Sequence, residues 1–197
     1  MDSELNGLLD ELATLERRLE ERLAARRAAY QYEIRRRRVI FAADIRAHHK
    51  AARKRLGRFL RDSPLSTLIT SPIIYSLVVP LALLDLMTCL YQWTCFAIWR
   101  IPRVRRADYV VLDRHRLPYL NAVQKLNCVY CGYANGVIAF GREVAARTEQ
   151  YWCPIKHALK AKGTPRRARS FLDYGDGRDI EEKFREFRRR LREAADD

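Results

Sequence analysis

The chain has 197 residues and a formal net charge of +14, from 38 Lys and Arg against 24 Asp and Glu. Charged and apolar residues are unevenly spread along it, which excludes one large core and favours several modest pieces. The positive charge indicates an acidic partner, either anionic lipid head groups or nucleic acid. Residues 1–4 lack the basic region and apolar run of a secretory signal, so we expect the chain to begin in the cytosol.

Leucines at heptad spacing mark the start of the chain. Their spacing alternates between three and four residues, which predicts a short coiled coil or an amphipathic helix packed on its own protein. These leucines are Leu5, Leu8, Leu12, Leu15 and Leu19. Self-association through this helix is therefore a hypothesis.

The next stretch is strongly basic, because residues 17–61 contain sixteen Lys or Arg and four acids. Apolar residues such as Ile34, Val39 and Phe41 lie between the charges at helical spacing. A basic helix with an apolar stripe can lie at an anionic membrane surface, where each Lys or Arg contributes roughly 1 kcal/mol. We therefore predict a basic amphipathic helical arm over residues 1–62; a solvated charged surface is the alternative.

Residues 63–99 form an apolar run in which Asp85 is the only charge. A bilayer span needs about 20 apolar residues, so the run is too long for one untilted helix and slightly short for two spans with a turn. Basic residues flank it, with Arg61 before and Arg100 after. Since basic residues stay on the cytoplasmic side, we expect both termini to be cytoplasmic.

Prolines interrupt this run and predict a helix-break-helix membrane hairpin, either re-entrant or spanning. The Ser71-Pro72 step resembles the Ser-Pro break in the re-entrant helix of monotopic phosphoglycosyl transferases, but no Asp-Glu catalytic pair follows it and no activity is carried over. One tilted span and a buried hairpin of a soluble protein remain alternatives. Asp85 is either a functional carboxylate or a group near the head groups or at a helix end.

Two pairs of potential metal ligands lie in the second half of the chain. Cys128 and Cys131 are three residues apart, and Cys153 and His157 are four apart. Four soft or borderline ligands in two pairs suit a tetrahedral metal ion. The odd total of five cysteines and this spacing argue against a disulfide framework. His115 is a polar group near this predicted module or a surface residue.

Residues 128–133 resemble the Cys-x-x-Cys-Gly-Tyr knuckle of rubredoxins and the Cys-x-x-Cys-Gly knuckle of zinc ribbons. In such a knuckle the chain turns back with positive φ, a conformation that Gly132 can adopt, so that backbone N–H groups point at the thiolates. Cys153 and Pro154 are expected to begin a helix, with His157 one turn later.

The predicted cofactor is structural Zn²⁺ held by Cys128, Cys131, Cys153 and His157. Iron in a mononuclear or iron–sulfur form and a metal-free redox dithiol are alternatives. The thiols could also be buried core groups beside an unrelated histidine. A catalytic zinc ion would need an open coordination position and a nearby general base.

A basic link and a final amphipathic helix end the chain, with an apolar stripe that includes Phe184, Phe187 and Leu191. The predicted fold is therefore mainly α. Its predicted parts are a basic amphipathic helical arm (1–62), a membrane hairpin (63–99), a Cys/His metal-binding module (100–162), a flexible linker (163–177) and a C-terminal helix (178–197).

These features favour a membrane-associated, metal-binding accessory or interaction protein on the cytosolic face. Its expected partners are anionic lipids and a protein, or a second copy, bound through the terminal helices. One alternative is a membrane-bound redox or metal-dependent enzyme that uses the Cys/His cluster. Another is a basic zinc protein that binds nucleic acid, against which the long uncharged run argues.

Overall fold

The computed structural model describes residues 3–29, 32–35, 38–41, 53–159, 162–176 and 179–193. The chain divides into two compact units. One comprises Met1–Arg61 with Asp113–Lys125, and the other comprises Asp62–Leu112 with Leu126–Asp197. The described residues are mainly helical, as the sequence predicts.

The first unit contains a long N-terminal helix, a small β-hairpin and two short helical pieces. Its elements are α1 (Ser3–Ala29), β1 (Tyr32–Arg35), β2 (Arg38–Phe41), α3 (Leu56–Arg61) and the 3-10 turn η2 (Arg114–Arg116). The leucines on α1 that the structure leaves exposed include Leu8, Leu15 and Leu19. α1 therefore presents apolar side chains at heptad spacing.

The β-hairpin replaces part of the predicted helical arm. β1 and β2 pair antiparallel, with Ile34 opposite Val39 and Tyr32 opposite Phe41. β-branched and aromatic residues favour paired strands, and here they outweigh the helical spacing on which the prediction was based. The basic stretch at residues 42–52 lies outside the described residues.

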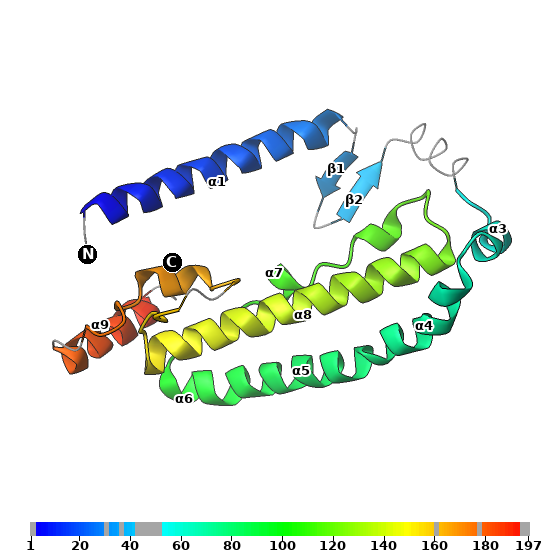
Figure 1. The fold of residues 1–197 in the computed structure, drawn as a ribbon. Helices are drawn as coiled ribbons and strands as arrows, with labels where there is room; N and C mark the ends of the chain where they lie inside the picture. The colour runs from blue at the N-terminus through cyan, green and yellow to red at the C-terminus, as the bar shows by residue number, and fades with distance from the viewer. Residues whose placement is uncertain are drawn as a thin grey trace. The chain divides into compact units, whose positions relative to one another are not determined.

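An apolar rod over residues 65–99 dominates the second unit. It consists of α4 (Leu65–Ser76), α5 (Val78–Tyr91), the π-helical turn η1 (Gln92–Phe96) and α6 (Ala97–Trp99). These elements follow one another in one line beside α8 (Ala122–Trp152), as Figure 1 shows. The chain therefore does not reverse inside the rod, and the predicted helix-break-helix hairpin at 63–99 is wrong.

The prolines are accommodated without reversing the chain. Pro72 cannot donate to the carbonyl of Leu68, but the Ser71 hydroxyl donates to that carbonyl at 2.8 Å. Such replacement donors are how apolar helices tolerate proline. Pro80 lies in the first turn of α5, where backbone N–H groups have less need of a helical acceptor.

The rod ends where the backbone of Arg100 turns into the left-handed region, with φ of 56°. The N–H of Ile101 then donates to the carbonyl of Phe96 at 2.9 Å. The following loop leads to α7 (Arg106–Tyr109). Gln92 fixes this loop, because its side-chain amide both donates to and accepts from the backbone of Val104.

α8 runs antiparallel to the rod. Tyr130 near its start donates to the carbonyl of Ile74, whereas Thr148 near its end pairs with the hydroxyl of Tyr91. A reciprocal cap begins the helix, because Asn121 and Gln124 each accept from the other's backbone N–H at 3.0 Å.

The core of the second unit lies at the end of the rod near Trp99. Its buried apolar residues are Phe96, Ile101, Val104, Phe140, Val144 and Leu191. The last of these belongs to α9 (Ile180–Glu193), the predicted amphipathic C-terminal helix. A smaller cluster joins Phe171, beyond the 3-10 turn η3 (Arg166–Ser170), to Phe187 of α9. The C-terminal helix thus packs on the rod's end.

Candidate functional site

The predicted metal ligands lie at two separated places, inside α8 and just beyond its end. Cys128 and Cys131 are one turn apart inside the helix, and Cys153 follows its last residue. Twenty-two positions separate Cys131 from Cys153, which corresponds to about 33 Å along a helix. Within the described ranges, which include all four predicted ligands, no group of three His, Cys, Asp or Glu residues is placed to hold a metal ion.

The predicted knuckle at residues 128–133 is a continuous part of α8, and Gly136, shortly after it, packs closely on a neighbouring segment. A Cβ atom added to Gly136 would lie 2.8 Å from the carbonyl oxygen of Tyr109 and 2.8 Å from the Cα of Val110. Only glycine permits this close approach between α8 and the chain after α7. Gly132 is also buried in the helix. The structure therefore does not form the predicted Cys3His module.

The second predicted pair is also arranged differently from the prediction. Cys153 donates its N–H to the carbonyl of Glu149, and Pro154 follows the end of α8 instead of starting a helix. His157 is exposed beside Lys156 at a small pocket of about 220 Å³. Zinc binding by these residues stays a prediction of the sequence.

Asp85, the one charge within the apolar rod, is 8% exposed and forms an ion pair. Arg106 of α7 binds it with two nitrogens: Nε donates to Oδ1 at 2.8 Å and Nη2 donates to Oδ2 at 2.6 Å. The Tyr133 hydroxyl donates to Oδ2 at 2.9 Å, and the Cys89 thiol lies 3.8 Å from Oδ1. The carboxylate is therefore surrounded by donors from three helices.

This cluster joins the rod, α7 and α8 at one point. Hydrogen bonding to Asp85 raises the pKa of Arg106 above its ordinary value, so the guanidinium stays charged. A fork of two donors fixes direction as well as charge. The arrangement explains Asp85 as the group that sets the position of α7 against the rod. The sequence could have suggested the pair, since Asp85 is isolated and Arg106 follows in the basic flank.

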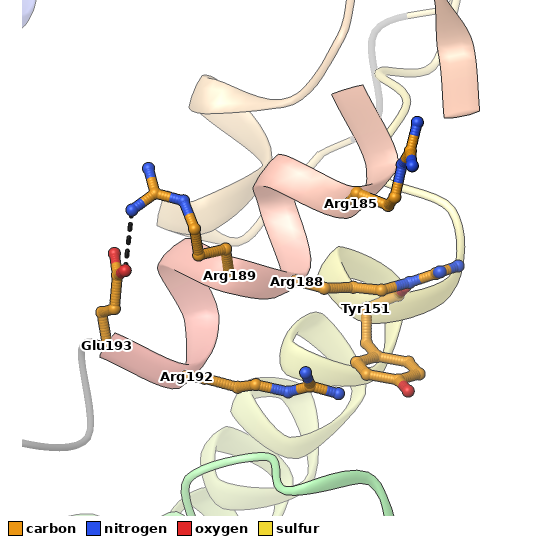
Figure 2. A pocket seen from close by; sticks show the side chains of 6 residues that line it. All are labelled: Tyr151, Arg185, Arg188, Arg189, Arg192 and Glu193. Atoms are coloured by element: carbon orange, nitrogen blue, oxygen red, sulfur yellow. Dashed lines mark hydrogen bonds and ion pairs between the residues drawn. The ribbon is translucent and has the colours of Figure 1, made fainter. Parts of the chain in front are cut away.

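A second candidate site is an arginine pocket of about 540 Å³ at the end of the rod near Trp99. It is lined by Tyr151 of α8 and by residues of α9, as Figure 2 shows; these residues are Tyr151, Arg185, Arg188, Arg189, Arg192 and Glu193. The guanidinium carbons of Arg188 and Arg192 lie 5.1 Å and 5.9 Å from the centre of the Tyr151 ring. The pocket was not predicted from the sequence, although four arginines at helical spacing indicate it.

An aromatic cluster connects the arginine pocket to the rod. Trp99, the last residue of α6, stacks on Tyr151 with ring centres 5.9 Å apart. It also meets Trp152 edge-on at 5.3 Å and Tyr91 at 6.2 Å. The Arg192 guanidinium donates to the carbonyl of Trp99 at 3.3 Å. Apolar rod, aromatic rings and arginines are therefore contiguous here.

Two buried polar atoms of the first unit have no hydrogen-bond partner in the described structure, Nδ1 of His115 and Nδ2 of Asn121. His115 lies on η2, away in the sequence from the predicted ligands. Asn121 already caps α8 with its other side-chain atom. Neither residue forms part of a cluster of ligand-type side chains within the described ranges.

Comparison with protein-family models, with curated proteins and with solved structures finds no match to this chain. The geometry above and the sequence itself therefore carry the functional argument.

Proposed function

We propose that this protein is a membrane-anchored accessory or interaction protein whose apolar rod is immersed in one leaflet of a bilayer. The observation that carries the proposal is the exposure of the rod: Leu65–Trp99 is long and apolar enough to cross a membrane, yet only 6% of its most apolar window is buried. A helix that is apolar all round requires an apolar environment.

The rod's exposed side chains are large and contiguous. Ile69, Leu83 and Ile98, which span its length, are 65%, 57% and 76% exposed. A contiguous apolar patch of this kind marks a membrane or protein contact, because burying one such side chain is worth about 1.5–3 kcal/mol. Lipid hydrocarbon would cover the whole exposed apolar surface of the rod.

The charges beside the rod favour an in-plane orientation over an upright span. α7 lies beside the middle of the rod, where Arg106 binds Asp85, and its neighbouring side chains Arg105 and Asp108 are 79% and 48% exposed. An upright rod would carry these charges to the centre of the bilayer, at a cost of about 2.5–3.5 kcal/mol for each. A rod parallel to the surface keeps them in water.

The rod's length supports the same orientation. Its 35 residues extend for about 52 Å, whereas the hydrocarbon core is about 30 Å thick. Spanning would therefore need a tilt beyond the usual range of about 0–40°. An in-plane rod also keeps the basic flanks at both of its ends on the cytoplasmic side.

The interaction part of the proposal rests on α1. This helix carries exposed leucines that include Leu8, Leu15, Leu19 and Leu23, three of which keep the heptad spacing of a coiled-coil seam. Such a stripe on a long helix suits a partner helix, either of a second copy or of another protein. The anchor would hold this helix at the membrane.

The experiment compares two matched double variants of the full chain. Leu83→Lys with Leu86→Lys adds two charges to the exposed rod, and Leu15→Lys with Leu19→Lys adds two to α1. We expect the rod variant to lose flotation with phosphatidylcholine vesicles while the α1 variant keeps it and loses self-association by sedimentation in detergent. Equal flotation of the rod variant and the unmodified protein would refute the anchor.

A further inference from the structure

Within the part of the chain that the structure describes, the arginine pocket presents positive charge that no carboxylate fully neutralises. Among the described residues, Arg189 and Arg190 form ion pairs with Glu186, and Arg189 also pairs with Glu193. No carboxylate in the described ranges forms an ion pair with Arg185, Arg188 or Arg192. The Arg188 and Arg192 side chains extend toward Tyr151, whereas Arg185 extends away from that ring and Arg189 points toward Glu193 (Figure 2).

Two of these arginines are held in place before any ligand arrives. Arg188 packs on the Tyr151 ring, and its Nε donates to the backbone carbonyl of the same residue at 2.9 Å. Arg192 packs on that ring and donates to the carbonyl of Trp99. Each guanidinium has further N–H donors, which suit an oxyanion with several acceptors. The side-chain entropy lost on binding is correspondingly small.

The location of the pocket identifies the source of the oxyanion. Trp99, the last residue of the rod, contacts both Trp152 and the Tyr151 ring on which the arginines pack, and aromatic residues of this type collect at the level of lipid head groups. A phosphate bound by the arginines would therefore have an apolar surface directly beneath it. That combination fits an amphiphile better than a free anion.

We propose that the arginine pocket binds the phosphate of an anionic phospholipid, with the lipid's acyl chains lying against the rod. This inference rests on the membrane-anchored arrangement proposed above. Arg188 and Arg192 hold the phosphate oxygens, Arg185 adds positive charge at the rim, and the aromatic cluster covers the glycerol region.

The test measures binding of short-chain lipids to the purified full-length protein in a nonionic detergent by calorimetry. The ligands are dihexanoyl phosphatidic acid, dihexanoyl phosphatidylcholine and inorganic phosphate. We expect phosphatidic acid to bind at least about tenfold more tightly than either of the others, because only it combines net negative charge with acyl chains. Equal binding of inorganic phosphate would overturn the lipid assignment.

Three double variants locate the binding. The double variant Arg188→Gln with Arg192→Gln should weaken phosphatidic acid binding by about thirtyfold. The double variant Arg188→Lys with Arg192→Lys keeps the positive charge but loses the paired N–H donors of each guanidinium, and it should weaken binding less. Arg103→Gln with Arg190→Gln removes the same charge outside the pocket and should change it by less than about threefold. Equal loss in the glutamine variant and this control would overturn the pocket assignment.

The lysine variant keeps the result interpretable if the glutamine variant fails to fold, since unchanged binding in the lysine variant also contradicts a fork-dependent site. Flotation with pure phosphatidylcholine vesicles separates this inference from the anchor. Pocket variants that float normally but lose phosphatidic acid binding would support both the membrane anchor and the phospholipid site. An unmodified protein that binds phosphatidic acid without floating would overturn the anchor alone.

Discussion

The two ends of the apolar rod are held in different ways. Near Leu65, α4 contains no buried residue, and its contacts with α8 include a hydrogen bond from Tyr75 to Asn127 and one from Tyr130 to the carbonyl of Ile74. Near Trp99, the rod buries Gln92 and Phe96 and joins a core of six residues. The rod is therefore locked at one end and largely exposed at the other.

This difference matches the two roles that we propose for the rod, which are contact with lipid and support of the arginine pocket. The Leu65 end has little to hold it within its own unit, so lipid contact is its main source of order. The Trp99 end is fixed by packing and buried hydrogen bonds, and it carries the arginine pocket. A binding site needs the rigid end, because arginines placed on a mobile helix would lose their fixed geometry.

The largest change in unfolding free energy should come from breaking the ion pair between Arg106 and Asp85, where the well-packed half of the rod begins. We expect Arg106→Leu to lower the free energy of unfolding in detergent by about 3 kcal/mol, because it leaves the Asp85 carboxylate buried with Tyr133 as its main donor. The figure is at the low end for buried pairs, since the Arg106 side chain is itself 41% exposed.

Two control variants test whether the loss comes from the unpaired Asp85 carboxylate. Arg105→Leu removes a neighbouring exposed pair with Asp108 and should cost less than about 1 kcal/mol. Asp85→Leu with Arg106→Leu should recover most of the lost stability, because no unpaired charge remains. A double variant less stable than Arg106→Leu alone would contradict the pairing.

A slightly smaller loss is expected where α8 contacts the chain after α7. Gly136→Ala places a methyl group 2.8 Å from backbone atoms of Tyr109 and Val110, which cannot yield as a flexible side chain would. We expect a loss of about 2–3 kcal/mol in chemical denaturation. Gly141→Ala is the matched control, with its nearest neighbour at 3.8 Å, and it should be neutral or stabilising by up to about 1 kcal/mol.

Gln92→Leu tests the hydrogen bonds that hold the loop after the rod. The leucine leaves both the N–H and the carbonyl of buried Val104 without their side-chain partner. We expect a cost of about 2 kcal/mol, measured as unfolding free energy, together with faster amide exchange at Ile101 and at residues 103–105. Unchanged exchange in this loop would show that Gln92 does not fix it.

Substitutions at the exposed Leu65 end of the rod should change the unfolding free energy only slightly. Tyr75→Phe removes one hydrogen bond to Asn127 at a partly exposed position, and we expect a cost of about 0.5–1 kcal/mol. Amide exchange in detergent should already be faster in α4 than in α5 before any substitution. A loss for Tyr75→Phe equal to that for Gln92→Leu would mean that the two ends are held alike.

The smallest effect concerns the two arginines that form ion pairs with Glu186. Hydrogen bonds from Arg189 and then Arg190 lower the pKa of Glu186 from 4.5 to about 2. The resulting stabilisation is fully present above pH 4.5 and is lost as the pH falls through about 2. Carboxyl NMR of Glu186 should show titration at the lower value. Because these groups are exposed, the unfolding free energy should barely change.

The apolar rod and α9 were predictable from the sequence because composition and spacing alone define them. Residues 63–99 exclude charges almost completely, and Phe187 and Leu191 belong to the stripe that the structure buries. Local patterns of this kind need no knowledge of the partner element. For the same reason, they did not reveal that the rod continues past Pro72 and pairs with α8.

The metal module was predicted from the types and spacing of its ligands. The structure separates these ligands because Cys128 and Cys131 lie inside the long helix α8, whose packing the ligand spacing does not reveal. Gly132 suits a knuckle as well as the interior of a helix, and the close approach of Tyr109 and Val110 requires the glycine at Gly136. The pair of Asp85 with Arg106 joins residues twenty-one positions apart. Such non-local pairings depend on the folded arrangement.

The most direct test of the in-plane rod is a depth measurement at three of its positions. Single tryptophans replace Ile69, Leu83 or Ile98 in a chain whose Trp93, Trp99 and Trp152 are phenylalanine, and quenching by lipids brominated at different acyl carbons gives the depth of each. For an in-plane rod we expect three similar depths within one leaflet. A deep Leu83 position between two shallow ends would show a spanning rod, and no quenching at any position would show that the rod is not in the membrane.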